Sequence, residues 1–173
     1  MATSEASWYS HCAFSSSSSP FVKVVHGWLA NVSATVGDLA PFVEVTVRID
    51  GQTERFDFLI DSGSDTSILM PVDAERLLGD QLFALDFEHG EQSVRLDGLG
   101  ASAFRILPIS ASLILEDDAQ SPLTIGAQLW VADPEPAGNW NEPSLFCRDA
   151  TRPGDFELSY SKETVTLIRP DEE

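Results

Sequence analysis

The stretch FDFLIDSGSDTSILMP, residues 56–71, decides the fold of this chain. It begins with apolar residues at alternate positions, the pattern of a strand with one buried face. Two further apolar residues lead directly to Asp61, and the chain then turns through a Ser-Gly pair. Burying a charge costs free energy. Either Asp61 opens an ordinary turn, or the strand holds its carboxylate in place for a chemical purpose.

Composition and charge limit the possible partners. The chain has 173 residues, enough for one compact domain, and its 43% hydrophobic content supports a packed core. Its 28 Asp and Glu residues outnumber its 10 Lys and Arg residues, which gives a formal net charge of -18 at pH 7. Nucleic acids and anionic membranes are bound by basic surfaces. We therefore expect no nucleic acid and no membrane as a partner.

The N-terminal residues 1–20 are polar and rich in Ser, which predicts a flexible tail before a single domain at residues 21–173. This tail lacks the basic start and the continuous apolar segment of a signal peptide. The two cysteines, Cys12 and Cys147, do not make a disulfide framework. We therefore expect a cytoplasmic protein. The three histidines lack ligand spacing, so we expect no metal and no cofactor.

Strand patterns dominate the rest of the chain. Residues 43–49 alternate apolar and polar side chains, and Asp50-Gly51 is a strong hairpin signal before the strand that ends at Asp61. Residues 70–80 predict a short helix with Pro in its first turn and Gly at its C-terminus. Other segments with strand patterns are FVKVV, SVRLDG, AFRILPISASLILED, LTIGAQLWVAD, PSLFC and FELSYSKETVTLI. Many short strands with one clear helix predict an all-β barrel or sandwich.

The Asp-Ser-Gly triplet alone is a weak signal, because Asp and Gly also favour ordinary turns. Three features strengthen it: the apolar residues before Asp61, the small hydroxyl residue Ser64 after the Gly, and an apolar run that returns the loop to the core. A second glycine turn, DGLGAS at residues 97–102, and the segment SLFCRDA at residues 144–150 lie further along the chain.

Together these segments resemble the retropepsin-like aspartic proteases. LIDSGSDTSIL resembles the strand and loop that carry the family's catalytic Asp, DGLGAS is similar to the glycine-rich tip of the flap, and SLFCRDA resembles an apolar-apolar-Gly-Arg-[Asp/Asn] segment behind that loop. The resemblance covers about residues 40–168. It implies an all-β, acid-protease barrel of six or more strands, closed on itself, with one or two short helices. Two positions depart from the pattern: Cys147 stands where the family usually has Gly, and Pro153-Gly154 would interrupt the following helix.

The resemblance implies an aspartic endopeptidase that hydrolyses peptide bonds in a peptide or protein substrate. Its water is activated by two carboxylates that share one proton, because two carboxylates so close together cannot both ionise. A chain with one such motif supplies one carboxylate. The resemblance therefore implies a homodimer in which the two Asp61 side chains meet at the two-fold axis.

Residue roles follow from the same resemblance. Asp61 is expected to be the catalytic residue, and Ser62, Gly63, Ser64 and Asp65 form the active-site loop. Ser62 is expected to hydrogen-bond across the dimer, and Gly63 to let the backbone approach water and substrate. Ser64 is expected to donate a hydrogen bond to the Asp61 carboxylate and so to lower its pKa.

Two further groups of residues have expected roles. Asp65 is expected to bind the substrate backbone or to pair with Arg148, which together with Asp149 would hold the loop in place. A mobile flap is expected to fold over the cleft. Its tip consists of Gly98, Leu99 and Gly100.

Other functions are weighed against this one. A metal-ion adhesion site needs oxygens at the positions of Asp61, Gly63 and Asp65, and Gly63 has none to offer. A calcium loop of the EF-hand type needs a bidentate Glu at the twelfth position, which is Val72 here. The remaining alternative, which Cys147 and the interrupted helix leave open, is a non-catalytic dimerisation or binding module with the retropepsin fold.

Overall fold

The computed structural model describes residues 22–31, 39–97, 103–116, 122–151, 155–159 and 164–170. The predicted N-terminal tail and the predicted flap tip at Gly98, Leu99 and Gly100 lie outside these residues. Within the described ranges, no helix is long and apolar enough to cross a membrane.

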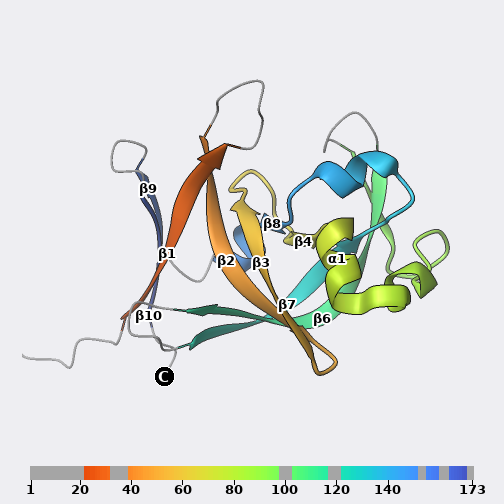
Figure 1. Ribbon diagram of the computed structural model, residues 1–173, viewed down its shortest axis with the longest axis horizontal. Helices are drawn as coiled ribbons and strands as arrows, with labels where there is room; N and C mark the ends of the chain where they lie inside the picture. Colours follow the sequence, from red (N-terminus) through yellow and green to blue (C-terminus); the bar gives the residue numbers. More distant parts are fainter. Residues whose placement is uncertain are drawn as a thin grey trace, which may run out of the picture.

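Strands make up most of the described chain (Figure 1). They are β1 (Val22–Asn31), β2 (Leu39–Ile49), β3 (Gln52–Ile60), β4 (Ile68–Leu69), β5 (Val94–Leu96), β6 (Phe104–Glu116), β7 (Pro122–Ala132), β8 (Leu145–Phe146), β9 (Asp155–Ser159) and β10 (Thr164–Pro170). The helical elements are α1 (Pro71–Leu78), α2 (Arg148–Thr151) and the 3₁₀ helices η1 (Gly79–Ala84) and η2 (Ala137–Asn141).

Six of these strands form a closed ring. The strands are hydrogen-bonded in the order β5-β6-β7-β4-β8-β3-β2-β1-β10-β9, and β6 also pairs with β2. This extra pairing closes the path through β2, β3, β8, β4, β7 and β6. The predicted all-β fold with a closed set of strands and two short α-helices is therefore confirmed.

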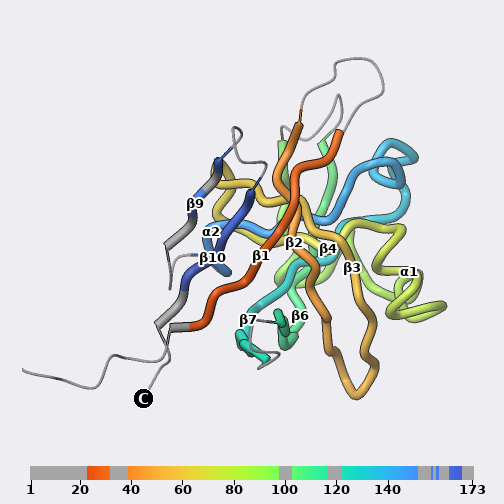
Figure 2. The backbone as a smooth tube through the Cα atoms, turned by 60° about the vertical axis from the view of Figure 1, so that its left-hand side comes forward, coloured from red at the N-terminus to blue at the C-terminus, as the bar shows by residue number. Residues whose placement is uncertain are grey.

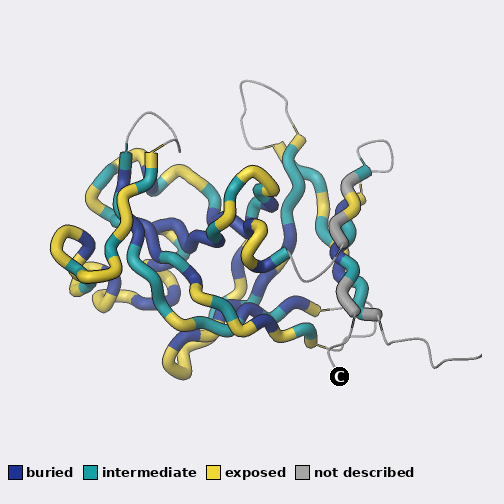
Figure 3. The backbone as a smooth tube through the Cα atoms, turned by 180° about the vertical axis from the view of Figure 1, so that it is seen from behind, coloured by how far each residue is buried: buried dark blue, intermediate teal, exposed yellow. Residues whose placement is uncertain are grey.

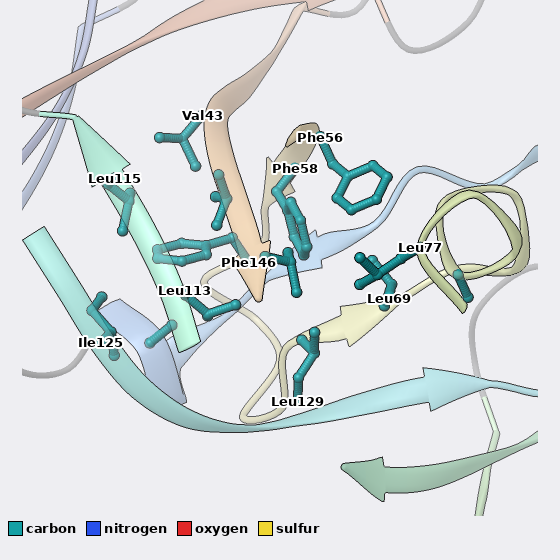
Figure 4. Packing of buried hydrophobic residues seen from close by; sticks show 14 of the residues in the cluster. Val43, Phe56, Phe58, Leu69, Leu77, Leu113, Leu115, Ile125, Leu129 and Phe146 are labelled. Carbon is teal, nitrogen blue, oxygen red and sulfur yellow. The ribbon is translucent and has the colours of Figure 1, made fainter. Parts of the chain in front are cut away.

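The β2–β3 hairpin is built as the sequence predicts. Asp50 and Gly51 form the turn with φ values of 48° and 85°, which place both residues in the left-handed region that the favoured two-residue hairpin turn requires. The alternating apolar side chains of both strands face the interior, where the fully buried Val43 lies opposite Phe58. Phe58 meets Phe146 of β8 edge-on, with ring centroids 6.4 Å apart (Figure 4).

The predicted helix is also present, as α1. It begins at Pro71 and ends at Leu78, and Gly79 follows with a φ of 55°, a conformation that glycine adopts without strain. Its buried face includes Ala74 and Leu77, which join the main core beside Leu69 of β4 (Figure 4). Most of the buried residues lie on the strands of the ring and on the inner face of α1 (Figure 3).

Strand β1 connects the ring to a smaller sheet (Figure 2). Its second part, from Trp28 onward, pairs with β2, whereas its first part pairs with β10, which in turn pairs with β9. Gly27 lies where β1 changes partner, and a Cβ placed there would sit 2.0 Å from the carbonyl oxygen of Phe42. Only a glycine allows β1 to cross β2 at this distance.

Candidate active site

Strand β3 delivers Asp61 to the edge of the ring. β3 and β8 run parallel, with Leu59 opposite Leu145 and Ile60 opposite Phe146. The backbone N–H of Asp61 continues this pairing, because it donates to the carbonyl of Phe146 at 3.1 Å. The backbone on which the carboxylate stands is therefore fixed by the central strands of the fold.

The Asp61 carboxylate is oriented by the turn that follows it. The backbone N–H of Gly63 donates to Oδ1 of Asp61 at 2.8 Å. A Cβ on Gly63 would lie 3.1 Å from the same oxygen, tighter than an ordinary contact, so glycine suits this approach. Asp61 is half-buried, while Ser62 and Gly63 are exposed. The carboxylate is thus held in one orientation and stays open to solvent.

The position of Ser64 corrects one expectation. Its hydroxyl lies 3.4 Å from both the backbone nitrogen and the backbone oxygen of Thr66, and it also hydrogen-bonds the thiol of Cys147. The expected donation from Ser64 to Asp61 is therefore wrong: in the described chain, the hydrogen bond to this carboxylate comes from the Gly63 amide. The tight turn brings the amide of residue i+2 to the carboxylate and directs the Ser64 side chain behind the loop.

Ser67 and Asp149 attach the loop to α2. The Ser67 hydroxyl, fully buried, donates to Oδ1 of Asp149 at 2.6 Å, and the Ser67 backbone N–H donates to Oδ2 at 2.9 Å. The same hydroxyl accepts the backbone N–H of Cys147 at 2.9 Å. Asp149 was predicted to hold the loop, but Ser67 was not predicted; its signal in the sequence is a hydroxyl at the start of a buried apolar run.

Asp65 and Arg148 make a second connection on the surface. Nη2 of Arg148 lies 2.8 Å from Oδ1 of Asp65, and the backbone N–H of Arg148 donates to the carbonyl of Ser64 at 3.1 Å. Both charged side chains are about half exposed, so the ion pair adds little to stability by itself. Its effect is geometric, because it attaches the far side of the loop to the start of α2.

The loop and ring can be compared with solved structures. The chain is similar to a retropepsin-like aspartic protease from Rickettsia conorii, with a TM-score of 0.52 and 15% sequence identity over 89% of this chain and 97% of that chain. The chain has the retropepsin-like fold. A second similar structure is the EIAV protease complexed with the inhibitor HBY-793, with a TM-score of 0.36 and 18% identity over 69% of this chain and 91% of that chain. No family model and no curated protein matches the chain.

Cys147 fits this retropepsin-like fold despite departing from the usual Gly. The side chain is fully buried in a small apolar cluster with Ile68 and Met70. Burial raises the pKa of the Cys147 thiol to about 12, and the hydrogen bond with Ser64 lowers it less than burial raises it. The thiol therefore stays protonated at neutral pH and fills space behind the loop.

Helix α2 is short, in line with the expected interruption. It spans only Arg148–Thr151 and ends just before the Arg-Pro-Gly segment, residues 152–154, which lies outside the described residues. Backbone N–H groups of Ala150 and Thr151 donate to the carbonyl of Cys147 at 3.1 and 3.0 Å. One turn is enough to present Arg148 and Asp149 to the loop.

A third hydrogen-bonded link lies on the other side of β8 and was missed by the sequence analysis. The buried hydroxyl of Ser144 donates to Oδ2 of Asp73 at 2.6 Å and accepts the backbone N–H of Met70 at 3.0 Å. The carbonyl of Ser144 accepts the backbone N–H of Leu59 at 2.8 Å. Burial raises the pKa of Asp73, although the Ser144 hydrogen bond and Arg76 act in the opposite direction.

Residues 90–97 of the predicted flap lie among the described residues, whereas the predicted tip does not. Strands β5 and β6 form a hairpin, with Val94 opposite Ile106 and Leu96 opposite Phe104, and this hairpin leads toward the predicted flap tip outside the described residues. Among the described residues, no three His, Cys, Asp or Glu side chains lie close enough together to hold a metal ion.

Proposed function

We propose that this protein is an aspartic endopeptidase that works as a homodimer, with one Asp61 from each subunit. One observation carries the proposal: Asp61 stands at the end of a central strand, half-buried and oriented by the Gly63 amide at 2.8 Å. The connections from the loop to Arg148 and Asp149 support it, because a catalytic carboxylate needs a rigid backbone.

The chemistry follows from two adjacent carboxylates with one proton between them. The ionised Asp61 takes a proton from a water molecule as its oxygen attacks the carbonyl carbon of the substrate. The protonated Asp61 gives its proton to the carbonyl oxygen, which produces a neutral tetrahedral diol. The proton held by the first carboxylate then passes to the amide nitrogen as the C–N bond breaks, and the diol returns a proton to the pair.

A second subunit is required because the sequence contains one Asp-Ser-Gly triplet. The exposed Ser62 and Gly63 leave the tip of the loop free for a contact across a two-fold axis. In the proposed dimer, Ser62 hydrogen-bonds to the partner's loop. The flap tip at Gly98, Leu99 and Gly100 covers an extended peptide or protein substrate and excludes water during the reaction.

A transition-state-like inhibitor of the pepstatin type tests this function directly. We expect it to bind the wild-type dimer and to inhibit cleavage of a peptide library, and Asp61→Asn to abolish cleavage while leaving the fold and the dimer intact. Asp80→Asn serves as the control, because it removes the same charge at an exposed position in the first turn of η1, outside the active-site loop. A folded dimer that neither binds the inhibitor nor cleaves peptides would be the non-catalytic module instead.

A further inference from the structure

A groove of about 340 Å³ lies beside the strand that ends at Asp61. Its apolar walls come from three parts of the fold: Phe42 on β2, Val72 at the start of α1, and Trp140 with Pro143 in the connection that leads to β8. Pockets for whole small molecules occupy roughly 300–1,000 Å³. This groove lies at the small end of that range and has room for one long side chain of a larger ligand.

The groove flanks Leu59, which precedes Asp61 by two residues. Phe42 pairs with Leu59 on one side, and on the other side Leu59 donates its backbone N–H to Ser144, the residue after Pro143. Side chains at i and i+2 of a strand point to the same face and lie about 7 Å apart along it. We expect a peptide bound at Asp61 to reach this groove, because Phe42 in its wall pairs with Leu59, two residues before Asp61.

The apolar walls are fixed in position. The Phe42 ring stacks on Trp28 with centroids 6.2 Å apart. The indole N–H of Trp140 donates to the carbonyl of Pro134 at 2.7 Å. Val72 is 42% exposed, so its apolar side chain forms part of the groove surface that a ligand can contact. These walls offer contact to the aliphatic part of a side chain, and the Trp140 ring offers a face to a cation.

Two carboxylates line the same groove, from Asp73 and Glu142. Among the described residues, Arg76 is the cation paired with Asp73, at 3.7 Å. Glu54 binds Arg76 more closely, and the guanidinium group lies over the ring of Phe56. Burial and the nearby Asp57 both raise the pKa of Asp73. The negative charge of the ionised carboxylate is therefore only partly balanced by its neighbours in the free protein. A cationic group in the groove would complete this balance.

We propose that this groove is a subsite for a basic side chain, Lys or Arg, of the peptide substrate. The inference rests on the proposed endopeptidase function and names its substrate class. The apolar walls take the aliphatic stem, while Asp73 and Glu142 take the cationic end. A formal net charge of -18 on the chain favours basic peptides over acidic ones at longer range.

Cleavage specificity is the first test. Wild-type protein is incubated with a library made by digesting a bacterial lysate after Glu, which retains internal Lys and Arg, and cleaved sequences are identified by mass spectrometry. We expect Lys and Arg to be enriched at one fixed position. Glu142→Gln or Asp73→Asn should each lower kcat/KM for the best Lys-containing peptide by about two- to fivefold, and leave its norleucine counterpart almost unchanged. Glu135→Gln, an exposed Glu outside the groove, is the matched control.

Binding without catalysis is the second test. Full-length Asp61→Asn protein is titrated with fluorescein-labelled forms of the best library peptide and of its norleucine counterpart, and fluorescence anisotropy is recorded. If no peptide is cleaved, the pair is Ala-Leu-Lys-Leu-Phe-Leu-Ala and the same peptide with norleucine for Lys. Tighter binding of the Lys peptide, lost in Asp61→Asn/Glu142→Gln and kept in Asp61→Asn/Glu135→Gln, supports the subsite.

The possible outcomes separate the two proposals. Cleavage without enrichment of Lys or Arg, or with groove variants that behave like Glu135→Gln, overturns the subsite and leaves the endopeptidase intact. Charge-selective binding without any cleavage supports recognition of a basic side chain by the groove and contradicts the endopeptidase. Absence of both overturns both.

Discussion

Ser67 and Asp149, which lie 82 residues apart in the chain, are joined by two hydrogen bonds of 2.6 and 2.9 Å. Through them, the loop that presents Asp61 is attached to the single turn of α2. The Ser67 hydroxyl also accepts the backbone N–H of Cys147, so one buried side chain contacts the segment around α2 at two points. The position of Asp61 therefore depends on polar contacts behind the loop as much as on the strand in front of it.

Removing this hydroxyl should cost stability. In Ser67→Ala, the buried Cys147 amide loses its acceptor and the Asp149 carboxylate loses one of its donors, which costs about 1–3 kcal/mol. For a chain of this size that corresponds to a fall in Tm of roughly 2–12 °C, measured by differential scanning calorimetry. Ser110→Ala, at an exposed position of β6, should leave Tm unchanged. Equal Tm values for the two variants would contradict the role assigned to Ser67.

Gly27 should tolerate no side chain. A Cβ at this position would lie 2.0 Å from the Phe42 carbonyl oxygen, so Gly27→Ala forces β1 away from β2 and is expected to cost about 1–3 kcal/mol or more. Gly126→Ala on β7 is the matched control, because a Cβ there meets no atom within 4 Å. Urea denaturation of both variants measures the difference. A Gly27→Ala protein as stable as Gly126→Ala would show that β1 crosses β2 at a greater distance.

Cys147 should be unreactive in the folded protein. Its pKa of about 12 leaves almost no thiolate at pH 8, and its burial blocks reagents. In a Cys12→Ser background, the Ellman reagent should therefore modify Cys147 only as fast as the protein unfolds, and at once in 8 M urea. Rapid modification under native conditions would place Cys147 at an accessible surface and contradict this packing.

Asp73 should make stability depend on pH. Its pKa is raised in the folded state, so the folded protein holds this proton at pH values where the unfolded chain has lost it. The contribution is therefore largest below the unfolded value of 3.8 and falls as pH rises through the higher folded pKa. Asp73→Asn retains an acceptor for Ser144 and should have a higher Tm than wild type at pH 7.

The comparison at low pH completes that test. Below the unfolded pKa of 3.8 the wild-type Asp73 is mostly protonated in both states, so the Tm advantage of Asp73→Asn should shrink. Arg76 on α1, Asp57 on β3 and Ser144 before β8 face this carboxyl, and all three stay unchanged in the variant. A Tm for Asp73→Asn that is lower than wild type at pH 7 would mean that Arg76 and Ser144 outweigh the cost of burial.

The sequence predicted the parts of the fold that depend on local patterns. The alternation in β2, the Asp50-Gly51 turn, and the Pro71 and Gly79 limits of α1 are all properties of neighbouring residues, and each is present. The closure of β6 onto β2 and the change of partner within β1 depend on pairings between distant segments, which local periodicity does not specify.

The same distinction applies to the site. Asp61 and Gly63 could be predicted from a short motif, and Asp65 with Arg148 from two motifs. The links from Ser67 to Asp149 and from Asp73 to Ser144 join residues more than 70 positions apart, so no spacing in the sequence indicates them. The expected contact of Ser64 with Asp61 was wrong because the tight turn places a backbone amide, and not the hydroxyl, at the carboxylate.

The central claim is that one active site uses Asp61 from two subunits, and subunit mixing tests it most directly. Wild-type and Asp61→Asn chains are unfolded, mixed at varying ratios and refolded together at constant total concentration, and cleavage of one library peptide is measured. If both carboxylates are needed, mixed dimers are inactive and activity falls as the square of the wild-type fraction, to about one quarter at equal amounts. Activity that falls in direct proportion to the wild-type fraction, to about one half, would contradict a shared pair of Asp61 side chains.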